Sequence, residues 1–317
     1  MSVLPLPSPS LVRRGAPLTP RALWRMNPPL VGSAAVLGTL GLVCLVGLAV
    51  DPRTLGGAPI WMKPLKFCVS GALYALALAV LIRPIRSRRT GRVIAWGVGA
   101  IVVVETVLIA AQAFRGVPSH FNVSTGTDAL LYSSMGLMIG TLWVLTLVGA
   151  VALLRTPSAD ALWKRASLWG LVLTLLGGSV GALMTSPTPA QVEGFATAPP
   201  DVVGAHTVGA PDGGPGLPVV GWSTVAGDLR VPHFWGLHGL QAVPLLALWL
   251  HRRRLSDRQR GRLLTVGALA YLGVLGVLLQ QALRAQSLVA PDAWTLGAVV
   301  AIALAAFAAV RLTLARP

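Results

Sequence analysis

Long apolar stretches alternate with polar connectors along most of this chain. From residue 30 onward, apolar runs of about 20 residues recur, and each is long enough to cross a bilayer as a helix. The pattern predicts an all-α fold, a polytopic transmembrane helix bundle. We expect eight spans, at 30–50, 60–82, 93–113, 129–154, 166–184, 232–250, 263–283 and 293–310.

The connectors between these runs predict the orientation. Every second connector is rich in arginine, as in RPIRSRRTGR at 83–92 and RRRLSDRQRGR at 252–262, whereas the intervening ones are poor in Lys and Arg. Because basic connectors stay in the cytoplasm, both termini are expected there. We therefore predict a multi-pass protein of the cell membrane (the inner membrane of a bacterium). Residues 1–29 are expected to form a disordered basic cytoplasmic tail, and residues 30–317 a single transmembrane domain.

The connector at 185–231 is longer than the others and is predicted to be extracytoplasmic. It is rich in Pro, Gly, Ala and Thr. Loops of this length are commonly either lids over a site or disordered segments. The sequence leaves both alternatives open.

Composition supports a membrane protein. Of its 317 residues, 54% are hydrophobic and only 11% are charged, whereas a soluble domain carries about 25% charge. A net charge of +16 would suggest nucleic acid as a partner in a soluble protein, but here the basic residues lie in the connectors and report topology. No nucleic-acid partner is expected. Cys44 and Cys68 lie inside apolar runs and are expected to be packed core residues.

Two pairs of glycines have the spacing of helix-packing seams. These are Gly136 with Gly140 and Gly177 with Gly181, each four residues apart.

Glu105 stands out because it lies inside an apolar run. A carboxylate in hydrocarbon costs at least ~2.5 kcal/mol, so it usually faces a protein interior or a wet cavity and has a partner. On a helix, Gln112 and Arg115 follow on nearly the same face. The other intramembrane polar residues also fall in the outer halves of their spans. The sequence therefore predicts a polar vestibule open to the outside, built from Lys63, Lys66, Glu105, Gln112, Arg115, His120, Asn122, Asp128, Arg230, His233, His238, Gln241 and Arg284.

Simpler roles are open for several of these residues. Glu105 has a structural alternative, an ion pair with Arg115, Lys66 or Arg284. Lys63 and Lys66 lie three residues apart beside Trp61, where lysines commonly extend to the membrane interface.

The histidines suggest two cofactors. Zinc held by His120, His233 and His238 would activate water, with Glu105 or Asp128 as the catalytic base. Alternatively, His120 or His238 would ligate a b-type haem, with cationic residues on its propionates. His233 and His238 are five residues apart, about 140° around a helix, so one metal reaches both only if the helix is irregular.

Three motifs carry a resemblance. WMKPLKF at 61–67, the stretch from Glu105 to Asn122 that ends in RGVPSHFN, and GDLRVPHFWGLHGLQ at 227–241 resemble a group of bacterial multi-pass membrane proteins of uncharacterised function. This resemblance covers spans two to seven and implies no activity. The outer histidines also resemble those of membrane zinc hydrolases of the ceramidase and adiponectin-receptor type. That group pairs its last histidines as HxxxH, whereas this chain has HxxxxH.

The favoured function is a membrane-embedded enzyme that acts on a lipid or a small hydrophobic substrate, with a metal or a haem. In the predicted site, Glu105 and Asp128 are catalytic, the three histidines bind the metal, and the remaining vestibule residues bind the ligand. The alternatives are a transporter or receptor that binds an anionic small molecule without chemistry, and a structural membrane subunit. The inner halves of the spans offer no polar path, which counts against transport.

Overall fold

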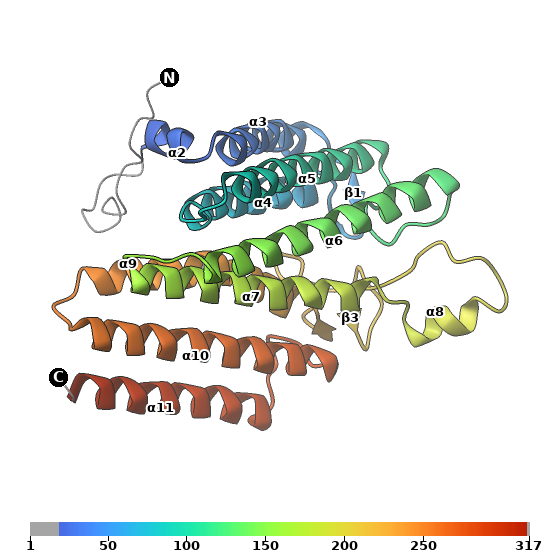
Figure 1. Ribbon diagram of the computed structural model, residues 1–317. Coiled ribbons are helices and arrows are strands. Elements are labelled where there is room, and N and C mark those ends of the chain that lie inside the picture. Colours follow the sequence, from blue (N-terminus) through green and yellow to red (C-terminus); the bar gives the residue numbers. More distant parts are fainter. Residues whose placement is uncertain (1–18, 316–317) are drawn as a thin grey trace, which may run out of the picture.

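A computed structural model describes residues 19–315 as an all-α bundle (Figure 1). Eight long helices run side by side, and they are α3 (Pro28–Val50), α4 (Met62–Leu81), α5 (Arg88–Arg115), α6 (Gly126–Leu154), α7 (Ala161–Thr185), α9 (Arg230–His251), α10 (Asp257–Leu283) and α11 (Ala293–Ala315). The short helices are α2 (Pro20–Met26) and α8 (Pro189–Gly194). Two short antiparallel pairs, β1 (Thr54–Leu55) with β2 (Ala58–Pro59) and β3 (Thr207–Val208) with β4 (Gly227–Asp228), lie in connectors.

Polar side chains at the connectors set where several helices begin. Ser87, Thr125 and Asp160 each accept a hydrogen bond from a backbone N–H in the first turn of α5, α6 and α7. As a result α5 begins at Arg88 rather than at residue 93, so its first turn carries arginines that the sequence placed in a connector. Of the predicted tail, residues 1–18 lie outside the described residues, and the remainder includes α2.

Seven of the long helices are long and apolar enough to cross a membrane, namely α3, α4, α5, α6, α7, α10 and α11. Their outer faces expose large apolar side chains, for example Leu137 at 74% and Phe307 at 64% exposure. Such surfaces are stable only against lipid. The chain is therefore an integral, multi-pass membrane protein in contact with the bilayer.

The eighth long helix, α9, is more polar and lies inside the bundle. It runs antiparallel to α7 along its length, since Gly181 lies beside His233, Gly177 beside Gly236, and Gly170 beside Leu240. It also contacts α10 and α4. Other helices cover most of α9, which keeps polar side chains such as His233 away from the lipid, whereas Leu245 and Trp249 near its end are exposed. The start of α3 and the end of α11 lie at the same end of the bundle (Figure 1).

Glycines permit the close approach of α7 and α9. A Cβ on Gly177 would lie 2.6 Å from the backbone nitrogen of Leu237, and one on Gly236 would lie 2.4 Å from the Cα of Gly177. The predicted seam at Gly177 is confirmed. The one at Gly136 and Gly140 is wrong, because a Cβ at either position would meet no atom within 4 Å.

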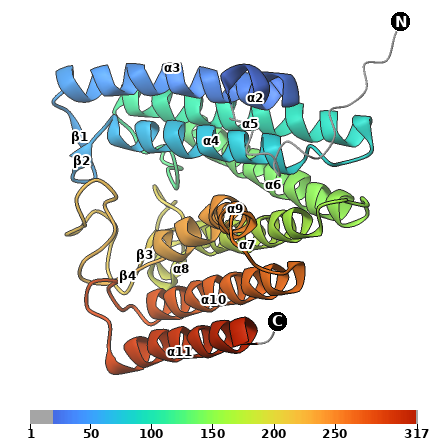
Figure 2. The ribbon, with the colours of Figure 1, turned by 90° about the vertical axis from the view of Figure 1, so that its left-hand side faces the viewer.

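The helices form two groups. Figure 2 shows α3, α4 and α5 on one side and α7, α9, α10 and α11 on the other, with α6 slanting between them. The apolar core runs through both groups, and it includes Leu37, Leu78, Leu171 and Leu240. We call the end that carries α8 and the two strand pairs the loop end, and the opposite end, where α5 and α10 begin, the arginine-rich end. The candidate site lies at the loop end, where the two groups meet.

Candidate functional site

The connector between α5 and α6 folds back toward the bundle. Gly116 ends α5 in the left-handed conformation with φ 76°, and Phe121 is also left-handed with φ 67°. A bulky residue at positive φ stores about 1–3 kcal/mol of strain, and such residues cluster at functional sites. The carbonyl of Phe121 accepts a hydrogen bond from the N–H of Val203 at 2.9 Å, which ties the connector to the long loop. This backbone geometry places the side chain of His120 above α5.

Glu105 is the most unusual side chain in the structure. It lies on α5, ten residues before the last residue of the helix, which corresponds to about 15 Å along the axis. Its exposure is 2%. Within residues 19–315, neither carboxylate oxygen has a hydrogen-bond partner. Its nearest ionisable contact is His120, whose Nε2 lies 3.9 Å from Oε1. The predicted ion pairs with Arg115, Lys66 or Arg284 are not formed.

The contacts of His120 define its tautomer. Nδ1 lies 3.3 Å from Lys63 Nζ and 3.0 Å from the Ser119 hydroxyl. Because an ammonium group only donates, Nδ1 is the acceptor, and the proton of a neutral imidazole is then on Nε2. Burial and the nearby charge of Lys63 hold the pKa of His120 well below its usual value of 6.5. At neutral pH, His120 therefore presents an N–H toward Glu105.

Aromatic rings enclose the other faces of His120. The rings of Phe67 and Tyr132 lie 5.8 and 6.4 Å from it, centre to centre. The Phe121 ring lies 6.4 Å away and itself contacts His206 at 4.8 Å. The site thus combines one buried carboxylate and one imidazole with apolar walls.

Residues 195–229, which we call the lid, fold over this site. The lid is held by its backbone carbonyls, since Lys66 donates to Val220 O at 3.1 Å and Arg230 donates to Gly221 O at 2.6 Å. Asp212 fixes the centre of the lid by accepting from the ring and backbone N–H of His206 and from Thr207 N–H. Of the two alternatives for the long connector, the structure therefore has the ordered lid.

The lid is expected to loosen as the pH falls. Burial lowers the pKa of His120 and, despite the hydrogen bond to Asp212, that of His206. Each of these histidines binds a proton more readily in the unfolded chain than in the folded protein. As the pH falls below about 6.5, protonation therefore favours the unfolded chain, and the free energy of unfolding decreases. Asp212 does not offset this loss. Burial alone would raise its pKa, but its bonds from His206 and Thr207 outweigh that effect and lower it.

Amide hydrogen exchange between about pH 7.5 and about pH 5 measures this effect. After correction for the intrinsic pH dependence of exchange, protection in the lid (residues 195–229) is expected to fall, while the connector at 82–87, which contains no histidine or acidic residue, serves as the internal control. Equal protection of the lid at both pH values would contradict the assigned role of the two histidines.

Several predicted site residues form a separate cluster that joins α5 to α6. Asp128 accepts from Arg115 at 2.8 Å and from Gln112 at 2.9 Å, and the Thr125 hydroxyl donates to it at 2.7 Å. Arg115 also donates to Gln112. All the partners of Asp128 are donors that stabilise its charged form, and it does not contact Glu105 or His120. This arrangement makes Asp128 a structural carboxylate at the start of α6.

The remaining predicted residues are distributed around the loop end. Asn122 accepts from the backbone and hydroxyl of Ser124 and shapes the connector. Arg230 pairs with Asp228 at 2.6 Å. Gln241 donates to Leu73 O at 3.4 Å, across the gap between α9 and α4. Arg284 pairs with Asp292 at 2.9 Å, at the connector between α10 and α11, so it is not part of the site around Glu105.

The predicted metal site is not assembled. Among residues 19–315, no three His, Cys, Asp or Glu side chains converge as metal ligands. His233 donates from Nδ1 to Gly177 O at 2.7 Å, and the His238 ring packs on Phe234 at 4.0 Å. Both histidines are therefore engaged in packing on α9. As a haem ligand His120 fits poorly, because Nδ1 accepts from Lys63 and Nε2 faces Glu105.

No pattern in the sequence pointed to His206 or Asp212 as site residues. Both lie in a loop rich in Pro and Gly, where no helical periodicity relates one residue to another. A histidine six residues before an aspartate is too common a pattern to identify such a pair. Phe67 and Tyr132 were missed because an aromatic residue in a membrane span usually packs against other helices or lipid.

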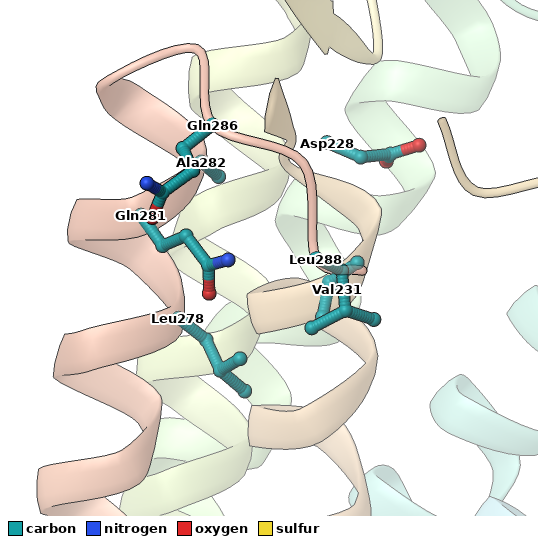
Figure 3. A pocket seen from close by; sticks show the side chains of 7 residues that line it. All are labelled: Asp228, Val231, Leu278, Gln281, Ala282, Gln286 and Leu288. Atoms are coloured by element: carbon teal, nitrogen blue, oxygen red, sulfur yellow. The ribbon is translucent and has the colours of Figure 1, made fainter. Parts of the chain in front are cut away.

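A small cavity beside the lid is not a ligand site. It is lined by the side chains that Figure 3 labels, among them Asp228, Gln281 and Gln286, and its volume is about 10 Å³. That space accommodates about one water molecule. The carboxylate of Asp228 points away from Gln281 (Figure 3), toward its partners Arg230 and Ser223.

Comparisons with known proteins add no family to this description. No family model, no curated protein and no solved structure matches the chain.

Proposed function

We propose that this membrane protein carries an acid–base site at its loop end, and that the site acts on a small amphiphile with a hydroxyl group. Glu105 would accept the hydroxyl proton, and His120 would donate a hydrogen bond from Nε2 to the same oxygen and so stabilise the negative charge left on it. Lys63, hydrogen-bonded to Nδ1, would keep the imidazole in the tautomer that makes this donation. The arginine-rich connectors support a cell-membrane location with the loop end outside the cytoplasm.

One observation carries this proposal, namely the burial of Glu105 without a hydrogen bond. A buried polar group left unpaired costs about 1–3 kcal/mol, and more for a charged group. Among residues 19–315, the buried Asp128 and Asp228 have both carboxylate oxygens bonded, and the buried Asp160 has one oxygen bonded to Trp163 N–H and the other 3.3 Å from His251. Within the same residues, Glu105 has neither oxygen bonded. It lies 3.9 Å from an imidazole whose N–H faces it, which is the arrangement expected of a general base beside a hydrogen-bond donor.

The surroundings favour a neutral ligand group that donates a hydrogen bond. Lys63 and Glu105 interact electrostatically and balance each other's charge, so a charged ligand would leave one charge uncompensated at this depth. The aromatic rings of Phe67, Phe121 and Tyr132 suit an apolar chain. A hydroxyl on an apolar chain meets both conditions.

The geometry does not favour an anion receptor. Each cation that the sequence assigned to an anionic ligand, apart from Lys63, already has a protein partner. Arg115 is paired with Asp128, Arg230 with Asp228 and Arg284 with Asp292, and Lys66 is bonded to a lid carbonyl.

A matched ligand panel tests the proposal. Long-chain alcohols, their methyl ethers and alkyl phosphates of the same chain length are added to purified protein, and its melting temperature is measured. We expect the alcohols to raise the melting temperature more than the ethers, because an ether has no proton for Glu105 to accept. Equal shifts by alcohols and ethers, no shift by any compound, or a shift by the alkyl phosphates alone would overturn the proposal. The last result would favour the anion receptor.

A further inference from the structure

A second site lies at the opposite end of the bundle, between α9, α10 and α11. It is an open groove of about 650 Å³. Its walls are almost entirely apolar, and they include Leu246 and Leu250 of α9, Val266 of α10, and Ala306 and Val310 of α11. The groove is about as large as an ordinary small-molecule site and opens toward the lipid rather than toward the lid.

Two arginines stand at one end of this groove. Arg253 and Arg254 follow Arg252, the residue that caps the end of α9, and both are exposed. Arg253 stacks on the Trp249 ring at 4.3 Å. Within residues 19–315, neither arginine has a carboxylate within ion-pair distance, because the nearby Asp257 is paired with Arg260. The groove thus has unneutralised positive charge at its mouth and hydrocarbon along its length.

The order of these features matches that of an anionic lipid in a bilayer. Along α9, the arginines come after the helix end, Trp249 lies two residues inside it, and Leu246 lies three residues further. Guanidinium groups at the interface, an aromatic ring beside them and aliphatic side chains below correspond to the phosphate, the glycerol region and the acyl chain. Basic pockets between transmembrane helices at this face are known to bind anionic head groups.

We propose that this groove binds one anionic phospholipid, with its phosphate on Arg253 and Arg254 and an acyl chain along Leu246, Val266 and Ala306. A free phosphate would leave the apolar walls uncovered. If a second copy of this chain covered the groove, the arginines of both copies would lie at the contact without acidic partners, and their like charges would repel each other. A lipid satisfies the charge and the apolar walls together.

Fluorescence of Trp249 offers a direct readout. Full-length protein is placed in nanodiscs of phosphatidylcholine with increasing brominated phosphatidylglycerol, which quenches a tryptophan that it touches. The chain has ten tryptophans, so Trp249→Phe identifies the share of the signal from the groove. We expect quenching that saturates and that is lost in Trp249→Phe. Brominated phosphatidylglycerol should reach half of the maximal quenching at a lower fraction of the lipid than brominated phosphatidylcholine does.

Three variants separate the roles of charge and shape. The double variant Arg253→Ala with Arg254→Ala is expected to weaken phosphatidylglycerol binding about 25-fold, because each arginine contributes about fivefold. Arg88→Ala with Arg89→Ala removes the same charge from exposed positions at the start of α5, away from the groove, and is expected to change binding less than twofold. Ala306→Phe fills part of the groove without changing its charge and without adding a tryptophan to the signal, and it is expected to abolish binding.

Three outcomes would overturn the lipid assignment. Equal quenching by the two brominated lipids would show that any acyl chain occupies the groove. If soluble glycerol phosphate displaced the brominated lipid as well as unbrominated phosphatidylglycerol does, the groove would be a simple phosphate site. The mass of the protein in the nanodisc shows whether it is a monomer or a dimer. If brominated lipid no longer quenched Trp249 in the dimer, the groove would be assigned to a second copy of the chain.

Discussion

Glu105→Gln is expected to abolish turnover of a hydroxyl-bearing substrate while the protein remains folded. Glutamine keeps the size of the side chain but cannot accept a proton at neutral pH. Loss of a general base lowers the rate by about 10²–10⁴-fold. The melting temperature should stay the same or rise, because the variant no longer buries a carboxylate that lacks a hydrogen bond. A residue with only a structural role would lower both quantities together.

The other glutamate of the chain provides the matched control. Glu193 lies exposed on α8, so Glu193→Gln makes the same chemical change away from the site. It should leave both turnover and melting temperature unchanged. If Glu105→Gln destabilised the protein and lowered turnover only in proportion to the loss of folded protein, the acid–base role would be refuted.

Gly177→Ala is expected to destabilise the protein strongly, because it adds a methyl group inside the α7–α9 seam. The new Cβ would lie 2.6 Å from the backbone nitrogen and 2.7 Å from the Cα of residues on α9, so no side-chain rotation relieves the clash. The two helices must separate, and overpacking of this kind costs about 1–3 kcal/mol. His233, which is bonded to Gly177 O, would move with the seam. Thermal unfolding in detergent, together with the yield of monodisperse protein, measures the effect.

Gly140→Ala is the control for that measurement. It adds the same methyl group to a transmembrane helix, but no atom lies within 4 Å of the new Cβ. Because alanine favours a helix by up to about 1 kcal/mol over glycine, this variant should be neutral or slightly more stable. If the two variants had the same stability, the close packing of α7 and α9 would be contradicted.

The transmembrane helices were largely predictable, because apolar length and arginine position are local properties of the sequence. Even α9, which is less continuously apolar than the seven candidate membrane spans, lies at 230–251 against an expected 232–250. The burial of Glu105 was also predictable, since a single carboxylate in an apolar run has few alternatives. The convergence of Lys63, Glu105 and His120 followed in outline from their shared depth.

The pairing of the other polar residues was not predictable, because it depends on helix rotation and on the course of the loops. Asp128 lay at the expected end of the bundle, yet its position in the first turn of α6 directs it to Arg115 and Gln112 rather than to Glu105. His233 was expected as a metal ligand, but the close approach of α7 presents Gly177 O to its ring. His206 and Asp212 reach the site only through the fold of the lid.

The position of the site has a mechanical consequence. α5 and α4 from one helix group carry Glu105 and Lys63, whereas α9 from the other group carries Arg230, which holds the lid. A shift of one helix group relative to the other would move the lid relative to Glu105. The lid carbonyls of Val220 and Gly221 bind one cation from each group, so the closed lid connects them.

A double-mutant cycle between Glu105 and His120 tests the paired site most directly, measured on the affinity for the best ligand from the alcohol panel. Glu105→Gln, His120→Gln and the combined variant are compared with the unmodified protein. If the two side chains act as one unit on the ligand hydroxyl, the double variant binds the alcohol no more weakly than the worse single variant. If instead the two losses multiply, Glu105 and His120 act independently, and the paired site described here is wrong.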